Sequence, residues 1–447
     1  MTHVSCARQM LSFIDKSPTC YQAVANLAAE LRECGFVELS EAQEWRLVPG
    51  GAYFVTRNQS SLAAFRLPES GTSSEGESAA ALGVAGFQIA AAHSDSPSLK
   101  IKSNPELPFG GDYVRLNVER YGGLLLKPWF DRPLSVAGRV LVRTSFGVES
   151  RLVDLRRNVA MIPSLAVHMD RSANEGHKVS VQDEMVPLVG MGDAAGSLAK
   201  QVAEAAGAEP ADVLGSDLFL YNSQQGCVWG LEEEFVSSRQ LDDLQCAWSL
   251  VQALKDARPA AGRAAVCAVF DNEEVGSGTK QGADSGFLSD VLARIAGGRD
   301  ELPRLLANSF LVSADNAHGV HPNYAGKADP TNRVVLNGGV VVKESANQRY
   351  TTDAVSRSVF ALICEAAGVP VQTFANHADI PGGSTLGNIA SSHVAVNAVD
   401  IGLPQLAMHS PYETAGVKDT WYLVEAMGAF YRTAVTMLAD GSFRVSA

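Results

Sequence analysis

The sequence predicts an α/β fold in which a sheet carries helices on both faces and is interrupted by an inserted, mainly β module. In the first and last thirds of the chain, helical patterns alternate with short apolar strands, which favours a sheet covered on both faces. From about residue 100 to residue 234, short β-type runs lie between Gly, Pro and Asp. The 447 residues, 46% of them hydrophobic, are enough for two domains or for one large, elaborated domain.

In the first third, the pattern predicts a helix and a buried strand. Apolar residues recur at helical spacing over 21–34 after a polar start, and Gly35 ends the run. The apolar run 86–92 is short and stops abruptly at His93, as a buried strand would. Between them, the polar segment 68–78 is rich in Gly and Ser and is expected to form an exposed loop.

The middle module is expected to contain short strands, and the last third helices and a strand. In the middle module, 113–118 and 138–143 have β-type composition and are bounded by turn residues. The elements expected in the last third are a helix over 241–256, a strand over 264–270 and helices over 353–367 and 419–438.

These patterns favour one discontinuous α/β domain with a single insertion. The α/β domain would comprise residues 1–102 and 237–447, and the β-rich insertion residues 103–236. Gly- and Pro-containing segments near both boundaries support this division.

Composition narrows the classes of function. The chain has 36 basic and 49 acidic residues, a net charge of −13, which argues against a nucleic-acid or anionic-membrane partner. The first residues do not resemble a secretory signal, and the longest apolar-leaning stretch, 79–92, is shorter than the roughly 20 residues that span a membrane. Seven scattered cysteines without a C-x-x-C pair fit reduced thiols. We therefore expect a cytoplasmic protein in which imidazoles and carboxylates hold any metal.

Four segments share one pattern: a short apolar run, expected to be a buried strand, ends in acidic or imidazole side chains. They are IAAAHSDS (89–96), AVCAVFDNEEVGS (265–277), FLVSADNAHGVHPN (310–323) and PQLAMHS (404–410). The carboxyl ends of strands in a doubly wound sheet form its ligand crevice, so these groups can converge. The converging set would be His93, Asp95, Glu273, Glu274, Asp315 and His409, a nitrogen and oxygen metal site.

The spacing within two segments suits chemistry with two cations. Such chemistry needs anionic ligands and one free carboxylate that accepts a proton from water. On an extended segment neighbouring side chains point in opposite directions, so one of Glu273 and Glu274 could bind metal while the other faces the water. His93 and Asp95 would project to the same side, which lets Asp95 orient the imidazole or modulate the metal.

Each piece has an ordinary structural alternative. A lone His-x-Asp is more often a surface or locally hydrogen-bonded pair, and paired glutamates are commonly a solvated face. His409 could be a half-buried histidine with satisfied hydrogen bonds. Taken together, the four strand ends favour a metal site, because charge at the end of a buried strand is costly unless it is paired or ligated.

Eight motifs, spread over essentially the whole chain, carry a family resemblance. They are AAHSDSP (91–97), WFDRPLSVAGRV (129–140), IPSLAVH (162–168), QLDDL (240–244), DNEEVGS (271–277), DNAHGVHPNY (315–324), NQRY (347–350) and QLAMHS (405–410). With them the chain resembles the M18 metallopeptidases, whose eukaryotic type member is aspartyl aminopeptidase. The resemblance implies a zinc-peptidase-like mixed sheet, a β-rich dimerisation domain as the insertion, and an aminopeptidase that acts on short peptides with acidic (Asp or Glu) N-termini.

The resemblance also implies a role for each matching residue. Five residues would hold two divalent metal ions per subunit, zinc first, with manganese or cobalt as alternatives: His93, Asp242, Glu274, Asp315 and His409. Asp242 would bridge the two ions, and Glu273 would be the general base. Asp95 would be a catalytic-site acid that lies beside His93 and does not bind the metal itself. From the pattern alone, Asp242 could equally be the N-cap of a helix over 243–256.

Three further residues and the assembly follow from the same family. His168 would reach a neighbouring subunit's active site and steady the developing oxyanion, or contact metal; without the family it would be a buried histidine of a β module. His318 and Lys343 would line the pocket for the acidic side chain of the substrate, whereas a lysine at a strand edge is a common alternative. The resemblance implies a homo-oligomer in which dimers assemble into a dodecamer.

Other functions stay open at this point. Binuclear deacylases and carboxypeptidases use the same chemistry on related scaffolds, and a free N-terminal amine requirement separates an aminopeptidase from both. A catalytically silent assembly protein could keep the fold, although every expected ligand is present.

Overall fold

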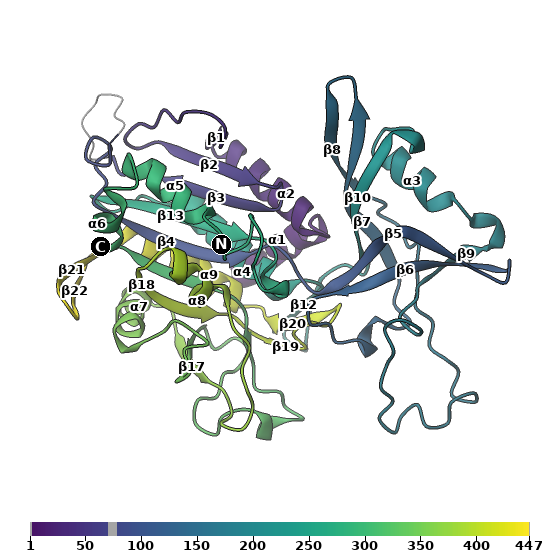
Figure 1. Ribbon diagram of the computed structural model, residues 1–447. Coiled ribbons are helices and arrows are strands. Elements are labelled where there is room, and N and C mark those ends of the chain that lie inside the picture. Colours follow the sequence, from purple (N-terminus) through teal and green to yellow (C-terminus); the bar gives the residue numbers. More distant parts are fainter. Residues whose placement is uncertain (1, 70–77, 447) are drawn as a thin grey trace.

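The computed structural model describes residues 2–69 and 78–446, so residues 70–77 of the expected exposed loop lie outside the described residues. Within those ranges the largest sheet is mixed and has nine strands; it forms the centre of the α/β part of the molecule (Figure 1). Its spatial order is β1 (Val37–Leu39), β2 (Ala52–Arg57), β3 (Ser61–Arg66), β13 (Arg263–Phe270), β4 (Gly86–His93), β14 (Phe310–Ala314), β18 (Asn397–Gly402), β16 (Val340–Glu344) and β17 (Val371–Ala375). β13, β4 and β14 are parallel neighbours at its centre, so three of the predicted strand ends meet at one edge.

Helices cover both faces because successive side chains of each strand point to opposite sides. Along β4, Ala90 and Ala92 pack into one apolar core, and Ile89 and Ala91 pack into another. The helices on the first core are α1 (His3–Asp15), α2 (Cys20–Glu33), α4 (Leu241–Lys255), α7 (Ala354–Ala367) and α9 (Asp419–Arg432). Those on the second are α5 (Phe287–Ala296), α6 (Leu302–Leu306) and α8 (Leu386–His393). The predicted mixed sheet with helices on both faces is confirmed.

A separate sheet lies beside this α/β part (Figure 1). Its six described strands pair antiparallel throughout, in the order β8 (Gly147–Asp154), β7 (Leu134–Thr144), β10 (Val213–Asn222), β5 (Ser98–Phe109), β6 (Tyr113–Tyr121) and β9 (Leu188–Met191). Helix α3 (Ser197–Ala205) packs against β8. The predicted β-rich module is therefore present, while its division from the α/β domain at residues 103 and 236 stays a prediction.

A smaller sheet joins segments that are distant in sequence. Among the described residues it has five strands, in the order β11 (Cys227–Trp229), β12 (Phe235–Ser238), β20 (Glu413–Gly416), β19 (Pro404–Leu406) and β15 (Ala317–His318). The fourth predicted strand end, at His409, thus follows β19 of this sheet and not a strand of the large one. No helix in the described ranges is both long enough and apolar enough to cross a bilayer.

The predicted helix over 419–438 is wrong in its last part, because α9 ends at Arg432. The residues that follow form a hairpin of β21 (Ala434–Ala439) and β22 (Ser442–Ser446). The start of β21 is rich in β-branched residues, and the Asp440–Gly441 pair that joins the strands is a typical two-residue hairpin turn.

Candidate metal centre

A cavity of about 360 Å³ opens near the carboxyl ends of the central strands. Eight of the predicted site residues line it: His93, Asp242, Glu273, Glu274, Asp315, His318, Lys343 and His409. Asp95 is buried next to His93. His168 is exposed in a loop of the inserted module and does not line the cavity.

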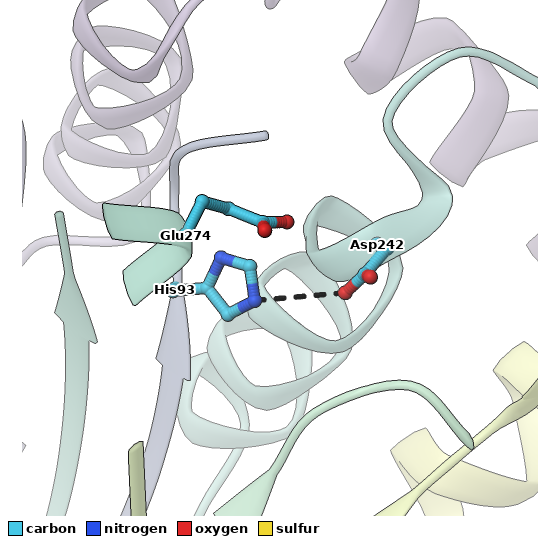
Figure 2. Close-up of side chains that lie close together, drawn as sticks. All are labelled: His93, Asp242 and Glu274. Atoms are coloured by element: carbon cyan, nitrogen blue, oxygen red, sulfur yellow. Dashed lines mark ion pairs between the residues drawn. The ribbon is translucent and has the colours of Figure 1, made fainter. Parts of the chain in front are cut away.

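His93 is the last residue of β4 and is 1% exposed. Its Nδ1 lies 3.0 Å from the backbone oxygen of Asp95 and 3.4 Å from Asp95 Oδ1. Both oxygens are acceptors, so in the neutral imidazole Nδ1 carries the proton and Nε2 keeps its lone pair. That Nε2 lies 3.5 Å from Oδ1 of Asp242 (Figure 2).

Asp242 departs from helical geometry although it lies in the first turn of α4. Its φ is −82° and its ψ 107°, and the peptide bond to Asp243 is cis. Its backbone N–H donates to Oε2 of the buried Glu413 at 3.0 Å. In this position, the two carboxylate oxygens of Asp242 face different histidines. Oδ1 lies 3.5 Å from His93 Nε2, and Oδ2 lies 3.5 Å from His409 Nε2.

Glu273 and Glu274 lie in a 3-10 turn, η4 (Glu273–Val275), and not on an extended segment. The expected alternation of neighbouring side chains therefore does not apply, yet both glutamates line the cavity. Asp95 fixes the turn, since its Oδ1 accepts from the N–H of Glu273 at 3.1 Å and its Oδ2 from that of Glu274 at 3.2 Å. Glu274 Oε2 lies 3.5 Å from His409 Nε2.

His409 follows β19 and has a φ of +68°. Its backbone N–H donates to Glu413 Oε1 at 2.8 Å, so one carboxylate holds the backbones of both Asp242 and His409. Its ring Nδ1 lies 2.9 Å from the carbonyl oxygen of Gly123. Because a carbonyl can only accept, the neutral ring of His409 also carries its proton on Nδ1 and directs a free Nε2 toward Asp242.

Asp315 directly follows β14, and the buried Lys343 lies beside it. Lys343 Nζ donates to the backbone oxygen of Asp315 at 2.7 Å and is 3.7 Å from its Oδ1. β16, which carries Lys343, pairs with β18 on one side and β17 on the other, so Lys343 is not at a sheet edge. His318 ends β15 and is exposed at the same cavity.

The acidic groups of the cavity are electrostatically crowded. Burial raises the pKa of Glu273 to about 8, and Asp315, Asp95 and Asp242 add to the effect. Burial also raises the pKa values of Glu274 and Asp315. For His409 burial alone would lower the pKa, but Asp242 and Glu274 raise it to about 10. A bound cation would relieve this crowding by favouring the ionised carboxylates.

The residues present fit a metal ion such as zinc. One atom from each of His93, Asp242 and Glu274 can be chosen so that all lie within 4.8 Å of one another (Figure 2). In the described chain, the buried oxygens Asp242 Oδ1 and Glu274 Oε1 have no hydrogen-bond partner. Ligands about 2.1 Å from a tetrahedral zinc lie about 3.4 Å from one another, close to the 3.5 Å contacts of Asp242 with the two histidines.

Two functional contacts were not predicted from the sequence. Glu413 lies beyond the QLAMHS motif in β20, and nothing in its local pattern separates it from a solvated glutamate. Gly123 lies in the inserted module, and only the pair Gly122–Gly123 suggests a place where backbone approaches another group closely.

Comparisons with known proteins agree on one family. Residues 13–431 match the family model described as "Aminopeptidase I zinc metalloprotease (M18)". The curated "Probable M18 family aminopeptidase 2" of Clostridium acetobutylicum is 42% identical over 435 residues, which cover 95% of this chain and 98% of the relative. A chain in the cryo-EM structure of the Ape4 and Nbr1 complex superposes with a TM-score of 0.91 at 36% identity, covering 96% of this chain and 86% of that one. The S. cerevisiae mApe1 dodecamer gives a TM-score of 0.82 at 28% identity, with 96% of each chain covered.

Proposed function

The chain belongs to the M18 family of zinc metallo-aminopeptidases, and on this basis we propose that it uses two metal ions per subunit to remove N-terminal residues from short peptides. The observation that carries the proposal is the position of Asp242. Each of its carboxylate oxygens lies 3.5 Å from the Nε2 of a different histidine, which is the arrangement expected of a carboxylate shared by two ions.

We propose two sets of ligands that share Asp242. His93 and Asp242 Oδ1 would hold one ion together with Asp315, which lines the same cavity. Asp242 Oδ2 and His409 would hold the other together with Glu274, whose Oε2 is 3.5 Å from His409 Nε2. Zinc is the metal that the family description supports, and manganese or cobalt would accept the same donors.

Glu273 would move the proton. When bound, divalent cations supply Lewis acidity that polarises the scissile carbonyl and lowers the pKa of water. Glu273 lines the cavity and is not needed as a ligand in either set, so its carboxylate is free to accept a proton from the attacking water. It would then give that proton to the amine that leaves as the peptide bond breaks.

His168 and the oligomer belong to the same proposal. His168 is exposed together with its neighbours Leu165, Val167 and Met169, a composition suited to burial against a second copy of the chain. There it would reach the partner's cavity and stabilise the oxyanion. The S. cerevisiae relative is a dodecamer, and we propose the same assembly of dimers here.

Lys343 and His318 support a preference for acidic N-terminal residues. Both line the cavity, and the pKa of the buried Lys343 is raised above its usual value, because Asp315 and Asp400 outweigh the opposing effect of burial. A permanent cation at the wall of the cavity would attract a substrate carboxylate, although Lys343 is already partly neutralised by Asp315.

Metal counting and a peptide panel test the proposal. We expect two zinc ions per subunit in the wild type and fewer in Asp242→Ala, with Asp256→Ala, at the exposed end of α4, as the matched control. Peptides with a free N-terminal amine should be cleaved and their N-acetylated versions left intact. A single zinc per subunit in fully active enzyme would reject the two-ion arrangement.

A further inference from the structure

We infer that the segment 121–125 of the inserted module positions the proposed metal ligands. The module would then shape the metal site in addition to forming a separate sheet. The inference rests on the proposed function, because it concerns the residues proposed to bind metal. It is carried by four contacts that this short segment makes with Asp95, Glu274 and His409.

The first contact is made by Tyr121, the last residue of β6. Its hydroxyl donates to Asp95 Oδ2 at 2.7 Å and accepts from Nδ2 of Asn272 at 2.9 Å. Asp95 is the residue that orients the His93 ring and accepts the backbone N–H groups of the Glu273–Glu274 turn. Burial raises the pKa of Tyr121, so the phenol keeps the proton that it donates. Through Asp95, Tyr121 therefore acts on His93 of the first ligand set and on the Glu274 turn of the second.

The second contact is a close packing of backbone against Glu274. Gly122 has a φ of +73°, and a Cβ at this position would lie 3.1 Å from the Cβ of Glu274 and 3.3 Å from its carbonyl oxygen. Only glycine takes this conformation without strain and leaves that space free. The segment thus sets how far the Glu274 turn can move toward the inserted module.

The remaining contacts hold His409. The Gly123 carbonyl accepts from His409 Nδ1 at 2.9 Å, and the backbone N–H of Leu125 donates to the carbonyl oxygen of His409 at 3.0 Å. A Cβ on Gly123 would lie 3.2 Å from that Nδ1, closer than an ordinary contact. The ring tautomer and the backbone of His409 are therefore both fixed from the inserted module.

These contacts reach both proposed metal positions from one stretch of chain. Tyr121 pairs with Ser98 in the antiparallel β5–β6 ladder, so the position of the segment depends on the six-stranded sheet. Its ring also packs edge-on against Phe219 of β10, with centroids 5.5 Å apart. A shift of the sheet would accordingly displace Asp95, Glu274 and His409 together.

Two substitutions test the inference in the full-length protein. Tyr121→Phe removes the hydroxyl and keeps the ring, and Tyr113→Phe, at the exposed other end of β6, is its control. Gly123→Ala places a methyl against His409, and Gly215→Ala, where an added Cβ meets nothing within 4 Å, is its control. Zinc affinity is measured by chelator competition, and ligand geometry by the visible absorption spectrum of the cobalt-substituted protein.

We expect zinc affinity to fall about 10- to 100-fold in Tyr121→Phe and in Gly123→Ala, with an altered cobalt spectrum, and both controls to match the wild type. The inference is overturned if zinc affinity and cobalt spectrum stay at wild-type values in both variants, even if the metal-free proteins unfold more readily. A wild-type protein that binds no zinc would refute the proposed function instead, so the two failures are distinguishable.

Discussion

Replacing Glu413 by glutamine should weaken zinc binding without a change in any proposed ligand. Glu413 is 2% exposed, and its two oxygens accept the backbone N–H groups of Asp242 at 3.0 Å and of His409 at 2.8 Å. A glutamine retains one acceptor oxygen but turns an NH₂ group toward the second N–H. One buried donor thereby loses its acceptor, which costs about 1–3 kcal/mol.

Part of that cost should appear as lost metal affinity, because the unpaired N–H belongs to the backbone of Asp242 or His409. Changes in groups that support ligands typically lower metal affinity about 10- to 100-fold, or about 1.4–2.7 kcal/mol, within the range of one lost hydrogen bond. Chelator competition measures zinc affinity, and denaturant unfolding of the metal-free protein measures stability separately. The control is Glu425→Gln on the exposed side of α9. Unchanged zinc affinity in Glu413→Gln would refute the reasoning.

Three more predictions follow from the site and its surroundings. Glu273→Gln should keep the bound zinc but lower kcat about 10²- to 10⁴-fold, and near-normal turnover would exclude Glu273 as the base. Lys343→Gln should lower the ratio of kcat/KM for Asp- over Leu-chromogen substrates, a ratio in which metal occupancy cancels; an unchanged ratio would remove Lys343 from substrate selection. Burial alone would raise the pKa of Asp217, but Lys100 and Arg139 hold it below 3.8. Asp217 therefore stabilises the fold above that pH and ceases to do so as the carboxylate protonates. Asp217→Asn should cost about 1–3 kcal/mol of unfolding free energy at neutral pH, a deficit that shrinks as the pH falls below 3.8; a deficit independent of pH would contradict this.

The strand ends of the site could be predicted from the sequence because they follow from periodicity. A short apolar run that stops at a charged residue predicts where a buried strand ends, and β4 and β14 end at His93 and Ala314 as this logic requires. Since β4, β13 and β14 are parallel neighbours, the convergence of their polar ends also followed.

The rest of the site depends on contacts between residues far apart in sequence. Asp242 became a candidate only through family resemblance, because its non-helical backbone is not visible in the pattern of α4. Glu413 and Gly123 act through the backbone of Asp242 and the ring of His409, and neither has a periodicity that marks it. Tertiary contacts of this kind leave no local pattern in a single sequence.

The parallel ladder between β4 and β13 also determines which sequence changes the centre can tolerate. Phe270 is paired in register with His93. Glu273 and Glu274 therefore follow, within a few residues, the position in β13 that lies beside the imidazole. Exchanging one apolar side chain for another inside these strands leaves that pairing intact. Inserting a single residue into β13 would shift everything after it by about 3.3 Å along the strand and turn each side chain to the opposite face. Length variation in relatives should therefore be confined to loops away from this pair of strands, whereas the apolar composition of the strands is free to drift.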